Sequence, residues 1–176
     1  MAKSSAKLVL TVLTLSALAS ALGSGAAGAK DPPARETPSG LPVPRYVSLK
    51  FDSVNARSGP GDDHRLLWVF HAKGLPVQVV AETAEWRRVC DPDGTLSWVH
   101  KRTTDGARTV MRTQAGPIPI RHGPRPSARV DAYLASKASA AMDRCDKGWC
   151  KVRVGQTSGW IEAGAVWGTN DAAQCR

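Results

Sequence analysis

An internal repeat constrains this chain more than any other feature of its 176 residues. The block 54–60 (Val-Asn-Ala-Arg-Ser-Gly-Pro) matches 118–124 (Ile-Pro-Ile-Arg-His-Gly-Pro), and the two arginines lie 64 positions apart. Two further pairs of blocks follow in the same order, Trp-Arg-Arg-Val with Trp-Cys-Lys-Val at an offset of 63 and Ser-Trp-Val with Gly-Trp-Ile at an offset of 62. Because the order is kept and only one residue is lost between successive blocks, the sequence predicts two copies of a unit of about 60 residues.

Short runs of β-forming residues, separated by turn signals, fill both copies. Residues 46–49, 77–79 and 150–154 alternate, and Gly, Pro or Asp-rich turns lie between such runs. After residue 29 we find no sustained helical period, and we interpret the Ala-rich stretch 132–142 as strand, loop and strand. The pattern predicts an all-β fold built as a small barrel or sandwich.

The repeated blocks resemble the bacterial SH3 family, whose pattern runs from V-N-V-R-S-G-P through W-x-x-V to G-W-V. The first copy matches closely, whereas Pro119 in the second copy leads us to expect its opening strand at a sheet edge. The resemblance covers residues 45 to about 168. It implies two tandem SH3-like β-barrels of five or six strands each, at 45–104 and 107–168, which touch each other and are followed by a C-terminal tail at 169–176.

The N-terminus has the pattern of a signal peptide. Lys3 and Lys7 precede an apolar stretch, Leu8 to Leu22, and Ala27-Gly28-Ala29 fits a cleavage site before Lys30. The stretch is short for a membrane span, which needs about 20 residues, although an uncleaved anchor stays open as an alternative. We therefore expect residues 1–29 to be a signal peptide and the mature protein to be periplasmic or secreted.

Pro and charged residues dominate 30–44, so we expect this segment to be an extended, poorly packed linker. Cleavage before Lys30 would lower the formal charge from +9 to +7, because it removes two lysines and no acid. A positive surface favours anionic partners, which outside the cytoplasm are envelope polymers, lipid head groups or acidic proteins rather than nucleic acid. The alternative is that the charge serves only solubility.

Large rings and glycines are expected to have structural roles. Trp98 and Trp160 lie in the middle of predicted strands, where one indole can fill much of a small barrel. Gly59 and Gly123 are expected to supply backbone freedom at a tight turn.

A candidate groove follows from the resemblance, because SH3-like barrels bind between the loop after the first strand and the next long loop. In the first copy this region offers Asp62, Asp63, His64, Arg65 and Trp68, facing Trp86. Charged and aromatic side chains together suit a peptide with charged and apolar groups. Trp86 begins a strand, and core packing remains its alternative role. The matching loop 125–129 of the second copy has no acids, so the two copies need not bind the same ligand.

Four cysteines in a chain predicted to be exported indicate disulfides. Cys145 and Cys150 flank a predicted turn, and residues opposite each other in such a hairpin come close enough to bond. Related tandem proteins share this spacing. Cys90 and Cys175 are left either to pair with each other or to stay free.

Catalysis and metal binding are not expected. None of the cysteines stands at a strand-to-helix junction that would activate its thiol. Cys145 and Cys150 lack two further ligands at the spacing of a zinc site. We expect no catalytic residue, no metal and no cofactor.

The sequence thus predicts a non-catalytic binding or adaptor protein of the cell envelope, with peptidoglycan or an envelope protein as its partner. Two alternatives stay open: a structural spacer with no ligand, and an accessory subunit of an envelope hydrolase. Fold alone does not choose among them.

Overall fold

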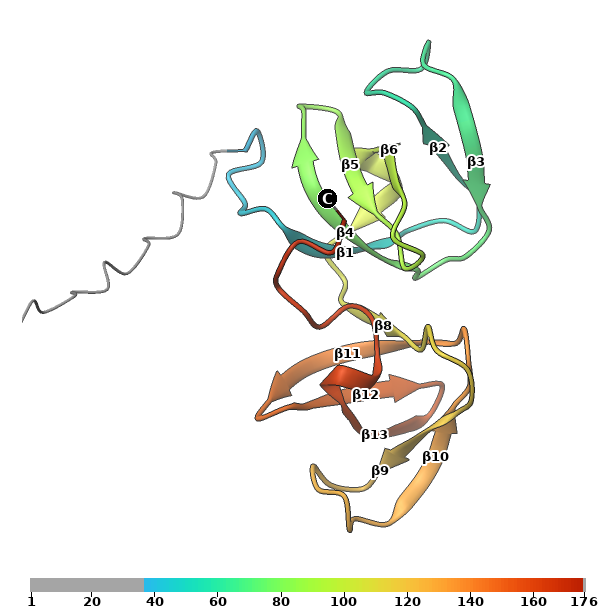
Figure 1. The fold of residues 1–176 in the computed structure, drawn as a ribbon, viewed down its shortest axis with the longest axis vertical. Coiled ribbons are helices and arrows are strands. Elements are labelled where there is room, and N and C mark those ends of the chain that lie inside the picture. The colour runs from blue at the N-terminus through green and yellow to red at the C-terminus, as the bar shows by residue number, and fades with distance from the viewer. Residues whose placement is uncertain (1–36, 176) are drawn as a thin grey trace, which may run out of the picture. The chain divides into compact units, whose positions relative to one another are not determined.

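The computed structural model describes residues 37–175, which form two antiparallel sheets (Figure 1). The predicted signal peptide, residues 1–29, lies outside the described residues, as does the start of the predicted linker. Within 37–175 no helix is long and apolar enough to cross a membrane.

The first sheet has seven strands in the order β3-β2-β6-β5-β4-β1-β7. They are β1 (Arg45–Leu49), β2 (Val54–Arg57), β3 (Leu66–Phe70), β4 (Pro76–Glu82), β5 (Trp86–Cys90), β6 (Leu96–His100) and β7 (Thr104–Asp105). A 3-10 turn, η1 (Lys101–Thr103), separates β6 from β7. The count exceeds the expected five or six because the two residues of β7 add to β1.

The second sheet has six strands in the order β10-β9-β13-β12-β11-β8. They are β8 (Thr109–Met111), β9 (Ile118–Arg121), β10 (Val130–Leu134), β11 (Ser139–Asp146), β12 (Trp149–Val154) and β13 (Thr157–Glu162), with a 3-10 turn, η2 (Ala163–Ala165), after them. The run β3-β2-β6-β5-β4 recurs as β10-β9-β13-β12-β11, which confirms the repeat.

Two details of the second copy bear on its expected strands. The Ala-rich stretch forms the end of β10, a turn and the start of β11, as predicted. The expectation that Pro119 marks an edge strand was wrong, because β9 lies between β10 and β13. Proline is tolerated there since β13 pairs with β9 at Arg121 alone, so the missing N–H of Pro119 interrupts no paired position on that side.

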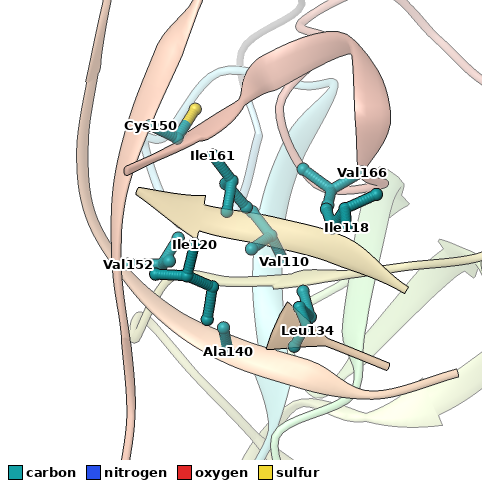
Figure 2. Close-up of a cluster of buried hydrophobic side chains, with 9 residues drawn as sticks. All are labelled: Val110, Ile118, Ile120, Leu134, Ala140, Cys150, Val152, Ile161 and Val166. Atoms are coloured by element: carbon teal, nitrogen blue, oxygen red, sulfur yellow. The ribbon is translucent and has the colours of Figure 1, made fainter. Parts of the chain in front are cut away.

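Each sheet encloses its own apolar core. In the first, valines from five strands gather around Leu49, and Val77, Val79, Val89 and Val99 are completely buried. In the second, Ile120, Leu134, Ile161 and their neighbours fill the interior (Figure 2). The described residues hold no α-helix, and the all-β class is confirmed.

The two strand-centre tryptophans do not fill these cores, contrary to expectation. Side chains alternate across a strand, and in β6 the buried residues are Ser97 and Val99, so Trp98 faces the other side and is half-buried. The same alternation in β13 buries Ile161 and leaves Trp160 half-buried, with the guanidinium carbon of Arg144 5.4 Å from the centre of its ring. Whether these indoles stabilise the fold from outside stays a prediction.

The described end of the predicted linker, residues 37–44, is packed rather than loose. The backbone N–H and the hydroxyl of Ser39 both donate to the Glu82 carboxylate, and Arg45 pairs with the same carboxylate. Val43 packs against the first core. A buried carboxylate with several donors therefore holds this segment on β4.

Contacts between the two copies involve polar groups on the first sheet. The Ser48 hydroxyl is 2.7 Å from the Thr109 hydroxyl, which donates to the Gly74 carbonyl at 2.8 Å. The Trp167 indole N–H donates to the Pro76 carbonyl, and the ring packs edge-on against Tyr46. These contacts tie residues of β1, of β4 and of the turn before β4 to the first residue of β8 and to Trp167, which follows η2.

The C-terminal tail lies on the first sheet, not on the sheet that precedes it in sequence. Cys90, at the end of β5, is bonded to Cys175 across 85 positions. The buried Gln78 amide in β4 donates to the Ala172 carbonyl at 2.8 Å and accepts from the Gln174 backbone N–H at 2.8 Å. This resolves the open alternative for the two remaining cysteines in favour of pairing.

Candidate functional site

The arginine of the repeated motif braces the loop that follows it, in both copies. Arg57 donates from Nη1 to the His64 carbonyl at 2.9 Å, and Arg121 donates to the Ala128 carbonyl at 2.9 Å. Backbone bonds match as well, since the N–H after each arginine donates to the carbonyl eight positions beyond that arginine. The motif therefore encodes a fixed loop shape rather than a binding contact common to both copies.

Gly59 makes room within this loop. A Cβ at this position would approach the His64 ring within 2.5 Å, so the imidazole of His64 lies over the glycine backbone. Neither Gly59 nor Gly123 has a φ in the left-handed region, which differs from the expected gain in backbone freedom. Gly123 meets only the Ala128 Cβ at 3.8 Å.

A cleft of about 250 Å³ lies on the first copy where the braced loop faces the end of β6. Its walls come from β2 and the loop after it, the start of β5, the end of β6, and η1. The lining residues are Ser53, Val54, Asn55, Arg57, Asp62, Trp86, His100, Arg102 and Thr103.

Trp86 and His100 form the aromatic part of this cleft. They are paired across β5 and β6, and their ring centres lie 5.1 Å apart at a tilt of 54°. Trp86 is only 8 % exposed, so its indole is largely a packing element whose edge reaches the cleft. His100 Nδ1 accepts the backbone N–H of Arg102 at 3.2 Å, which holds the imidazole in place at the start of η1.

Charges of both signs surround these rings. Arg57 Nη2 lies 3.3 Å from the Asp62 carboxylate, whose side chain is 79 % exposed. Arg102 is exposed and has no side-chain bond within the described residues. The cleft thus offers one free guanidinium and one solvated ion pair beside an aromatic edge, which suits a ligand with a carboxylate and an apolar part.

The structure places the residues predicted for the groove in three different locations on the first copy. Trp86 and Asp62 line the cleft, whereas Asp63, His64 and Arg65 are exposed on the loop and line no described cleft. Trp68 lies in a second hollow of about 330 Å³ with Phe70, Asp91, Asp93 and Thr95. The predicted facing of Trp68 and Trp86 therefore does not occur in a single cleft.

Sequence reasoning missed Asn55, Arg57, His100 and Arg102. Arg57 and Asn55 stand inside the repeated motif, where they were treated only as marks of the family. His100 and Arg102 follow the G-W-V block directly, and their proximity to Trp86 depends on the β5–β6 pairing and on η1. If the W-x-x-V and G-W-V blocks had been paired as neighbouring antiparallel strands, His100 would have been placed opposite Trp86, with Arg102 close by.

The second copy carries a hollow elsewhere. It measures about 360 Å³ and lies along the β11–β12 hairpin and β13. The lining residues are Ala141, Met142, Asp143, Lys151, Val152, Arg153 and Ser158. Where the second copy matches the first copy's cleft, Asp131 of β10 pairs with two residues of the preceding loop, His122 at 3.1 Å and Arg129 at 2.9 Å. The two copies thus present different surfaces.

Cys145 and Cys150 are directly opposite each other in β11 and β12 and are bonded, as predicted, with their Cα atoms 4.0 Å apart. Neither pair leaves a free thiol among the described residues. Within 37–175 no group of three or more His, Cys, Asp or Glu side chains has the arrangement of a metal site.

Comparisons with known proteins agree with this architecture. The family model of the bacterial SH3 domain matches the chain twice, over residues 50–106 and 114–168. Since these matches span more than half of the chain, the protein belongs to the bacterial SH3 domain family. With its two disulfides, such a chain fits an extracytoplasmic protein.

Two solved structures are similar to it. NlpC1 from Trichomonas vaginalis is 14% identical with a TM-score of 0.31, and the match covers 70% of this chain and 45% of that one. NlpC2 from Trichomonas vaginalis is 13% identical with a TM-score of 0.32, and the match covers 70% and 47%. The chain thus spans just under half the length of both. A comparison with curated proteins gave no match.

Proposed function

We propose that the protein is a non-catalytic binding module of the bacterial cell envelope, periplasmic or secreted. Bacterial SH3 domains commonly bind cell-wall components, which makes peptidoglycan, or an envelope protein, the partner. The single observation that supports a ligand is the cleft of the first copy, where the exposed Arg102 stands beside the Trp86–His100 pair.

The chemistry of the cleft favours a ligand that carries a carboxylate. The exposed Arg102 guanidinium can donate hydrogen bonds to the carboxylate, and the ring edges supply apolar contact for the atoms next to it. Peptide stems of the cell wall and acidic protein segments both have this combination. The hydroxyls of the lining residues Ser53 and Thr103 make no hydrogen bond to the His100 ring among the described residues, and His100 Nδ1 accepts a backbone N–H instead, so we propose binding without chemistry.

A co-sedimentation assay with purified sacculi tests the proposal. We expect binding at low salt that weakens toward physiological salt, where exposed charges are screened beyond about 8 Å. Arg102→Glu should lower affinity by roughly threefold to tenfold, as expected for the loss of one exposed charge contact. Arg125→Glu changes the same charge on an exposed loop of the second copy and is the matched control.

Trp86→Ala is a poorer test, because so deeply buried an indole stabilises the first copy as well. If wild-type protein fails to sediment with sacculi at low salt, and also captures no envelope protein, the binding proposal is wrong. A structural spacer would then be the better account. If Arg102→Glu and Arg125→Glu lose affinity equally, general charge rather than the cleft binds the polymer.

A further inference from the structure

The hollow beside Trp68 combines an apolar floor with a carboxylate, and it lies apart from the cleft of Trp86 and Arg102. Trp68 and Phe70 project from one face of β3 and pack edge-on, with ring centres 5.8 Å apart. Leu66 pairs with Arg57 beyond a register shift in the β2–β3 pairing, so it does not belong to this pair of rings. Two large aromatic side chains thus form a strip on one face of β3.

The opposite wall of the hollow is the turn between β5 and β6, and hydrogen bonds to the Asp91 side chain hold this turn together. The Asp91 carboxylate is buried and accepts the backbone N–H groups of Asp93 at 3.0 Å and Thr95 at 2.8 Å. Asp93 is thereby held at the rim with its side chain 77 % exposed. On a chain of net charge +9, a carboxylate fixed beside two aromatic rings is a local site for a cation.

An ammonium group already lies at this rim. Lys137, from the turn between β10 and β11, has its Nζ 3.4 Å from Asp93 Oδ1, and both side chains are mostly exposed. Lys137 also lines a small hollow of about 90 Å³ together with Phe70 and Asp93. The contact shows that Asp93 binds a positively charged group. Because the Lys137–Asp93 pair is mostly exposed, the ammonium group of a ligand can take the place of the Lys137 ammonium.

The second copy lacks every part of this arrangement. Ala132 occupies the register of Trp68, because Ile120 pairs with Ala132 as Ala56 pairs with Trp68. The matching turn, between β12 and β13, is only Gly155 and Gln156 and contains no carboxylate. The aromatic strip and the acidic turn therefore occur together in the first copy only, on an otherwise shared scaffold.

The free edge of β3 identifies the form of the ligand. β3 ends the first sheet, and among residues 37–175 no strand pairs with its outer side. An extended peptide can add to such an edge through backbone hydrogen bonds, with alternate side chains reaching the same face. We propose that β3 and the Asp91–Thr95 turn bind an extended peptide whose lysine-type ammonium enters the hollow between Trp68 and Asp93.

The test uses the full chain and the synthetic peptide acetyl-Thr-Val-Lys-Val-Thr-amide, with Kd measured by calorimetry. The same peptide with Nε-acetyl-lysine keeps the length and removes the charge, and we expect its affinity to be lower by about tenfold. Shifts of the Trp68 indole N–H resonance should accompany binding of the charged peptide. Equal affinity of the two peptides would overturn the proposal.

Variants locate the site. Asp93→Asn should weaken binding about threefold to tenfold, whereas Asp146→Asn, an equal change of charge on β11, should leave it unchanged. Lys137→Asn removes the competing ammonium and should tighten binding; asparagine suits the φ of 61° at this position. Equal effects of Asp93→Asn and Asp146→Asn, or weaker binding by Lys137→Asn, contradict the site.

Trp68→Ala places at this register the residue that the second copy has there, and it should abolish detectable binding with the β-sheet spectrum retained. If Trp68→Ala unfolds, the Asp93→Asn and Lys137→Asn variants decide whether the peptide binds at this site. Nα-acetyl-lysine methylamide tests the strand edge: if it binds as tightly as the peptide, β3 pairing contributes nothing and the peptide ligand is wrong. Arg102→Glu should bind the peptide normally, which separates this result from the test of the proposed function.

Discussion

Arg57 and Arg121 hold the same position in the two copies and donate to the same carbonyl of the loop that follows. Truncation removes a charge-assisted hydrogen bond and frees the loop. We expect Arg57→Ala and Arg121→Ala each to lower the free energy of unfolding by about 1–2 kcal/mol, measured by urea denaturation. Arg125→Ala, on an exposed part of the second loop, should change it by less than about 0.5 kcal/mol. Equal effects of all three would deny the bracing role.

Glu82 makes the free energy of unfolding depend on pH in the acid range. Although burial disfavours its charged form, hydrogen bonds from Ser39 and Arg45 lower the pKa of Glu82 to about 2. A carboxyl group with a lowered folded-state pKa stabilises the fold above its unfolded pKa, about 4.3, and loses that contribution as pH falls through its folded pKa.

We therefore expect the wild-type free energy of unfolding to decline between about pH 4.3 and pH 2. Glu82→Gln should be less stable at pH 7, since Arg45 and Arg87 lose their anionic partner, and its stability should fall less over the same acid range. Urea titrations at pH 7, 4 and 2.5 compare the two proteins. Parallel curves for the variant and the wild type would contradict this role of Glu82.

At the scale of the strand, β6 and β13 show how one motif packs in two ways. A Cβ at Gly159 would lie 2.6 Å from Ile120 Cγ2 and 2.7 Å from the Arg121 carbonyl oxygen, so β13 requires glycine there. Ser97 holds this register in β6, and its hydroxyl is buried without a hydrogen-bond partner among residues 37–175. The space beside β6 is therefore wider but apolar.

We therefore expect a methyl group added at position 159 and a hydroxyl removed at position 97 to have opposite effects on the stability of the protein. Gly159→Ala should destabilise the protein by about 1–3 kcal/mol, because backbone must shift. Ser97→Ala should be neutral or stabilising by up to about 1 kcal/mol, because it removes an unpaired buried hydroxyl. Thermal unfolding of both variants gives the comparison. Destabilisation of similar size in both would show that the two strands pack alike.

The positions of several strands along the chain were predictable from sequence, but the faces of the strands were not. Repeated blocks identified β2, β5, β6 and their counterparts because local patterns decide those elements. The side of β6 that Trp98 occupies depends on which of two alternating faces meets the core, and ring size alone favoured the wrong one. The cleft combines Arg57, His100 and Arg102 through pairing across the sheet, which no block contains by itself.

At the scale of the whole molecule, the two disulfides constrain very different lengths of chain. Cys90–Cys175 spans 85 positions and Cys145–Cys150 spans five. By loop-closure entropy the long bridge contributes up to about 4.5 kcal/mol and the short one about 2 kcal/mol. Cys175→Ala should therefore lower the free energy of unfolding more than Cys145→Ala, measured by urea denaturation under non-reducing conditions. The reverse order would show that the tail contributes little.

The position of the tail also decides how the molecule would carry a pulling load. If both termini were pulled, the covalent path would run through residues 37–90, cross to Cys175 and leave, so residues 91–174 would bear no tension. The second copy would then stay folded while the first was stretched, and its surface would remain available throughout. Reduction of the Cys90–Cys175 disulfide would place the second copy in series with the first, so that the distance between the pulled termini could increase further.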